Sequence, residues 1–180
     1  MDGEASTPRP GLTCPFDKLR PSQLVRDDTF YMSLAFNLAV DAWRVDEVPI
    51  GAVIVCEGEI IARDGNRTLE LNDPTAHAEI NAIRAACKKI ADFDLRGASI
   101  YTSCEPCPMC LAAIYWARLD AIFYANNKLD AAAIQFDDNF IYQQLSKPVD
   151  ERSIPMTQLL RDEASAAFVL WRNTASKTPY

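Results

Sequence analysis

The first regular pattern along the chain is helical. Asp27 and Asp28 are residue types that often begin helices, and apolar side chains follow them at intervals of three and four residues. The pattern predicts an amphipathic helix that begins near Asp28 and ends before Pro49. Its apolar positions are Phe30, Leu34, Ala35, Leu38 and Ala42.

Short apolar runs then alternate with further helical segments. Residues 52–56 and 59–63 flank the turn residues Glu57 and Gly58, which predicts a β-hairpin. Strands separated by helices are typical of an α/β domain built around one sheet. The later expected elements are a helix from Thr75 to about residue 90, strands at 98–102 and 121–125, a helix that follows Cys104, a strand at 156–160 and a helix at 162–173.

The chain has 180 residues, of which 49% are hydrophobic and 24% are charged. This composition predicts one folded domain. Four of the eleven prolines lie in residues 1–26, which show no helical or strand period. We therefore expect residues 1–26 to be a flexible extension and residues 27–180 to form the domain.

Charge and hydropathy argue against nucleic-acid binding, a membrane segment and secretion. The 18 basic and 25 acidic residues give a formal net charge of −7, which makes a nucleic-acid partner unfavourable because phosphates attract clustered Lys and Arg. No apolar run is long enough to cross a membrane, and the first ten residues do not resemble a secretory signal. We therefore expect a cytoplasmic protein with no membrane segment.

One histidine and a tight group of cysteines carry the candidate chemistry. Cys107 and Cys110 are three residues apart at the start of a predicted helix, and His77, the only histidine, starts another. One imidazole and two thiolates are ligands that suit zinc, and three protein ligands leave one coordination position open. Zinc in such a site acidifies a water molecule for hydrolysis. Glu79, two residues after the histidine, is then a candidate proton shuttle.

Other interpretations of the cysteines stay open at this point. Cys104 could complete a closed structural zinc site, which would have no open position and no reaction. An iron–sulfur site or a group of reduced core thiols would also use closely spaced cysteines. A zinc-stabilised module without enzymatic activity is therefore an alternative to an enzyme.

H-x-E followed by P-C-x-x-C resembles the zinc-dependent nucleobase deaminases of the cytidine-deaminase superfamily. The resemblance covers most of the chain from about Asp28 and, within the superfamily, is greatest to bacterial guanine deaminases. It implies a three-layer α/β/α fold with a mixed sheet of about five strands. The segments that carry it are 72–79, 101–110, 114–118, 136–138, 171–173 and the terminal Tyr180.

This resemblance also implies roles for individual residues. His77, Cys107 and Cys110 would bind zinc, and Glu79 would move protons. Asn66, Ala78, Asp138 and Tyr180 would contact the base, with residues 171–180 closing the site. Asp138 has a rationale of its own, because a carboxylate can accept from both N1–H and the 2-amino group of guanine.

The implied function is hydrolytic deamination of guanine to xanthine and ammonia by a homodimer, in which the C-terminal tail of one subunit can close over the site of the other. One segment departs from the guanine deaminases. Residues 47–52 resemble tRNA adenosine deaminases, and Ile50 stands where the guanine enzymes carry an aromatic residue. A tRNA-specific adenosine deaminase, or a deaminase of another small base or nucleoside, is therefore the alternative.

Overall fold

Four strands form one mixed sheet in the part of the chain that the computed structural model describes, residues 26–178. Their order across the sheet is β2-β1-β3-β4. Strand β1 pairs antiparallel with both β2 and β3, whereas β3 and β4 are parallel. The strands are β1 (Gly51–Cys56), β2 (Glu59–Gly65), β3 (Ala98–Cys104) and β4 (Ala121–Asn126).

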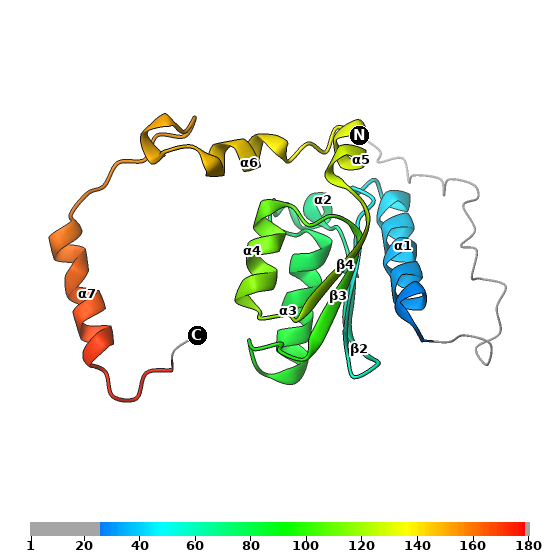
Figure 1. The fold of residues 1–180 in the computed structure, drawn as a ribbon, viewed down its shortest axis with the longest axis horizontal. Coiled ribbons are helices and arrows are strands. Elements are labelled where there is room, and N and C mark those ends of the chain that lie inside the picture. Colours follow the sequence, from blue (N-terminus) through cyan, green and yellow to red (C-terminus); the bar gives the residue numbers. More distant parts are fainter. Residues whose placement is uncertain (1–25, 179–180) are drawn as a thin grey trace, which may run out of the picture. The chain divides into compact units, whose positions relative to one another are not determined.

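Helices cover both faces of this sheet. Figure 1 shows α1 (Asp28–Arg44) on one face and α3 (Ala78–Ile90) and α4 (Pro108–Trp116) on the other. The structure therefore confirms the expected α/β/α layers. The sheet has four strands in the described residues rather than about five, because residues 156–160 have no regular structure. Their apolar side chains are exposed and have no strand partner that would hold them extended.

The start of α1 follows from its cap. Asp27 accepts a hydrogen bond from the backbone N–H of Phe30 at 2.9 Å, as the acidic pair predicted. The helix packs closely on β1 at Gly51, where an added Cβ would lie 2.3 Å from the carbonyl oxygen of Ala35. Only a glycine allows the helix this close to the strand that leads into the site.

Two local predictions need correction. Helix α3 begins at Ala78 rather than at Thr75, because the hydroxyl and N–H of Thr75 both donate to the Asp73 carboxylate in the preceding turn. A four-residue helix, α2 (Thr68–Leu71), also follows β2 and was not expected. Both differences lie in the loops that lead to His77.

The chain divides into two compact units after Asn139. The first contains the sheet, its helices and α5 (Lys128–Ala133). The second consists largely of α6 (Asn139–Ser146), a short 3-10 turn at Val149–Glu151 and α7 (Arg161–Asn173). A single domain over residues 27–180 stays a prediction. The proposed extension, apart from Arg26, and Tyr180 lie outside the described residues.

None of the helices within residues 26–178 combines the length and the apolar character that crossing a membrane requires.

Candidate active site

The candidate site lies where helices α3 and α4 begin. His77 is the residue that caps α3, and Cys107 caps α4. Both have extended backbones, with ψ angles of 155° and 168°. Their side chains are therefore not held to helical periodicity, which explains how His77 and Glu79 can both serve one site although they are two residues apart.

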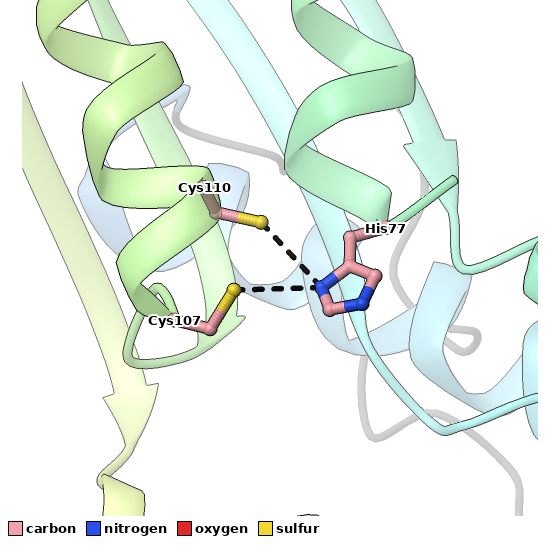
Figure 2. A group of neighbouring side chains, drawn as sticks. All are labelled: His77, Cys107 and Cys110. Atoms are coloured by element: carbon pink, nitrogen blue, oxygen red, sulfur yellow. Dashed lines mark hydrogen bonds between the residues drawn. The ribbon is translucent and has the colours of Figure 1, made fainter. Parts of the chain in front are cut away.

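Three side chains meet here at distances that suit a metal ion. Nδ1 of His77 lies 3.6 Å from Sγ of Cys107 and 3.6 Å from Sγ of Cys110 (Figure 2). A tetrahedral zinc ion with ordinary bond lengths separates a nitrogen and a sulfur ligand by about 3.5 Å. All three ligand atoms lie within 4.8 Å of one another, and this group does not include Cys104. The residues present therefore fit zinc with an open position.

Hydrogen bonding shifts the pKa values of the two thiols in opposite directions. Hydrogen bonding to Cys110, and then to His77, lowers the pKa of Cys107 to about 4. The interaction with Cys107 and burial raise the pKa of Cys110. The pKa of His77 is raised first by its hydrogen bond to Cys107. The N-termini of α3 and α4 add positive potential at the same place.

Glu79 is buried beside this group, with 2% of its surface exposed. Burial is the main reason that its pKa is raised. Oγ1 of Thr102 donates to Oε1 at 3.3 Å, and Sγ of Cys110 donates to Oε2 at 3.5 Å. A carboxyl group in this environment can take up a proton and release it again.

Two buried oxygens near the site have no hydrogen-bond partner among the described residues, Oδ1 of Asn66 and Oδ1 of Asp138. The side-chain N–H groups of Asn66 are already used, by Glu47 at 3.0 Å and by Thr68 at 3.1 Å. Burial is the main cause of the raised pKa of Asp138, and the nearby Cys107 raises it further. Unsatisfied buried acceptors are rare in folded proteins, and a bound ligand is one explanation for them.

Asn81 connects the loops that carry the site. Its side-chain amide donates to the carbonyl of Gly65 at 3.0 Å and to that of Ala76 at 3.1 Å. Gly65 directly precedes Asn66, and Ala76 directly precedes His77. One buried side chain therefore holds the backbone on both sides of the site.

The other predicted residues lie at or near this region. Ala78 is fully buried as the first residue of α3, where a backbone N–H has no partner within the helix. The ring of Phe136 lies 5.5 Å from that of His77. Ile50, where the resemblance leads us to expect an aromatic residue, lines with Phe136 a largely apolar cavity of about 450 Å³. Tyr180 lies outside the described residues.

Three residues of the site were not expected from the sequence: Glu47, Thr102 and Asn81. Glu47 reaches Asn66 across 19 positions, and Thr102 reaches Glu79 across 23. The only sequence signal for these residues is a polar side chain close to apolar ones. Glu47 precedes β1, Thr102 lies within β3 and Asn81 lies within α3.

Comparison with known proteins agrees with this geometry. Residues 25–126 match the zinc-binding region of cytidine and deoxycytidylate deaminases. The guanine deaminase of Bacillus subtilis (strain 168) is 54% identical over 132 residues, which are 73% of this chain and 85% of that protein. A tRNA-specific adenosine deaminase of Agrobacterium fabrum is 48% identical over 115 residues, which are 64% of this chain and 76% of that one.

The fold agrees as well. The crystal structure of the Bacillus subtilis guanine deaminase superposes with a TM-score of 0.83, at 48% sequence identity, over 86% of this chain and 99% of that chain. The metal-binding group lies in the segment that matches the family. The chain therefore belongs to the cytidine and deoxycytidylate deaminase family of zinc-binding proteins.

Proposed function

We propose that this protein hydrolyses guanine to xanthine and ammonia. The observation that carries the proposal is the pair of buried, unpartnered acceptors, Oδ1 of Asn66 and Oδ1 of Asp138, close to a zinc-binding group. Guanine presents N1–H and its 2-amino group on one edge, and a carboxylate can accept from both. The similarity to a guanine deaminase over 73% of the chain supports the same substrate.

In this proposal His77, Cys107 and Cys110 would hold zinc, which would supply an acidified water molecule as the nucleophile. Glu79 would take a proton from the attacking water and give it to N3 of the base, next to the attacked C2. Glu79 would then take the second proton, from the new hydroxyl on C2, and give it to the 2-amino group, so that the C2–N bond breaks, ammonia leaves and the C2 carbonyl of xanthine forms. Thr102 orients the Glu79 carboxylate through the bond to Oε1. Asn66 and Asp138 hold the base. The backbone N–H of Ala78, in the same helical turn as Glu79, also contacts the base in this proposal.

Deamination of adenosine in tRNA is the second candidate. The 48% identity to a tRNA-specific adenosine deaminase and the similar residues 47–52 favour it. The net charge of −7 and the higher identity over a longer segment of the guanine enzyme count against it. Assaying the zinc-loaded protein with free guanine and with a tRNA anticodon stem-loop decides between the two.

We also infer that the protein acts in the cytoplasm as a homodimer. Five reduced cysteines among the described residues suit a reducing compartment. Helix α4 exposes 75% of Tyr115 and 65% of Trp116, and large exposed aromatic side chains side by side favour an interface. We propose that residues 171–180, with Tyr180, close over the base.

Replacing a metal ligand should remove zinc. Cys107→Ser and Cys110→Ser should lower the bound zinc well below one per chain and abolish turnover, because each removes a thiolate. Cys104→Ala is the matched control and should keep one zinc, measured by elemental analysis of the purified protein. Loss of zinc from the Cys104 variant would favour the closed structural site.

Glu79→Gln should separate metal binding from catalysis. The variant should keep its zinc and lose about 100- to 10,000-fold in kcat, because an amide cannot shuttle the proton. Steady-state ammonia release together with zinc analysis checks this. Activity close to that of the parent protein would take Glu79 out of the mechanism.

Asp138→Asn should impair recognition of the base. An amide can accept only one of the two guanine hydrogen bonds and turns an N–H toward the other, so kcat/KM for guanine should fall by about 100-fold or more. Asp137→Asn is the matched control, since Asp137 is exposed and its carboxylate accepts from the backbone N–H of Asn139. Equal losses in both variants would contradict the proposed role of Asp138.

The assembly and the tail can be tested together. Light scattering should give about twice the chain mass of 20.1 kDa, as expected of a dimer. Deleting residues 174–180 should raise KM for guanine while the zinc content is unchanged. A monomeric mass would refute the dimer, and an unchanged KM would refute the closing role of the tail.

A further inference from the structure

Glu47 is a buried carboxylate that the proposed reaction does not use. It lies between α1 and β1, and 4% of its surface is exposed. Its Oε1 accepts from the backbone N–H of Glu70 at 2.8 Å, and its Oε2 accepts from the side-chain amide of Asn66 at 3.0 Å. Burying a carboxylate is costly, so a specific purpose is expected.

The bond to Asn66 determines which way that amide points. An ionised carboxylate can only accept hydrogen bonds, so the group of Asn66 that faces Glu47 must be its NH2. The second N–H of Asn66 is directed to Oγ1 of Thr68 at 3.1 Å. Both donors are thereby used within the protein, and Oδ1 is left buried without a partner.

We propose that Glu47 is a positioning residue that fixes the Asn66 amide, so that the pocket offers the base an acceptor instead of a donor. The inference rests on the proposed function in one respect, namely that Asn66 contacts the base. Asp138 also presents an unpartnered acceptor. A ligand must then bring an N–H group to each of these oxygens, and one that brings a lone pair to Asn66 is rejected.

The geometry makes an isosteric substitution informative. The backbone N–H of Glu70 requires an acceptor, so the oxygen of a glutamine at position 47 would face Glu70 and its NH2 would face Asn66. Asn66 would then turn its Oδ1 toward this NH2 and to the hydroxyl of Thr68, which can donate as well as accept. The buried network stays complete, but the pocket now presents an N–H.

The test compares Glu47→Gln, Asn66→Asp and the double variant. Glu47→Gln should keep its zinc and its melting temperature close to those of the parent and lose about 100-fold or more in kcat/KM for guanine, mainly through KM. Asn66→Asp alone places two carboxylates together, so its kcat/KM for guanine should also be lower than that of the parent. The double variant restores one carboxylate and one amide in exchanged places and should recover kcat/KM to within about tenfold of the parent.

A second readout does not need turnover. In nuclear magnetic resonance spectra of the ¹⁵N-labelled protein, the side-chain NH2 of Asn66, identified by its loss in Asn66→Asp, should be protected from solvent exchange. In Glu47→Gln the resonance of this NH2 group should shift, and its protons should exchange with solvent faster. Glu59→Gln is the control for charge, since Glu59 is exposed and pairs with Arg26, and it should behave like the parent.

Each outcome decides a separate point. If the parent protein does not deaminate guanine but the Asn66 resonance responds as described, the proposed substrate is wrong and the positioning role stands. If Glu47→Gln keeps full activity and an unchanged Asn66 resonance, the positioning role is refuted. A loss of activity that only follows a fall in melting temperature, with no recovery in the double variant, would show that Glu47 is merely structural.

Discussion

The site depends on the meeting of two helix N-termini. His77 and Cys107 each occupy the extended position before a helix, so they can turn toward one another while α3 and α4 remain regular. Hydrogen bonds to Cys110 and His77 lower the pKa of Cys107, and the positive potential of the helix ends also favours a thiolate there. The rest of the fold, from the parallel pair β3 and β4 to the packing of α1 on β1, keeps these two helix starts in place.

Much of this arrangement could be predicted from the sequence because it rests on local rules. The cap at Asp27, the hairpin around Gly58 and the three close ligands follow from residue type and spacing. The strand expected at residues 156–160 was wrong, because an apolar run forms a strand only where another strand pairs with it. The start of α3 was misplaced because Thr75 bonds backward to Asp73 instead of forward into the helix.

The residues that orient the ligands could not be found this way. Glu47, Asn81 and Thr102 act through contacts between segments far apart in the chain, and an isolated acid, amide or hydroxyl has no periodicity to reveal it. Their burial, seen only in the structure, indicates that they have a specific function. Each of these three side chains loses hydration on burial and gains hydrogen bonds within the protein. Oδ1 of Asn66 and Oδ1 of Asp138 are buried without such a bond. Each of these two oxygens costs about 1–3 kcal/mol of stability, which a ligand can relieve.

The amide of Asn81 has a consequence for cooperativity. It ties the backbone before His77 to the backbone before Asn66, so neither loop can shift without straining the other. If Asn66 contacts the base as proposed, ordering of His77 also orders the segment that meets the base, and thermodynamic linkage makes the effect reciprocal. Under the proposed function, affinity for the metal and affinity for the base would then be coupled through the two backbone contacts of Asn81.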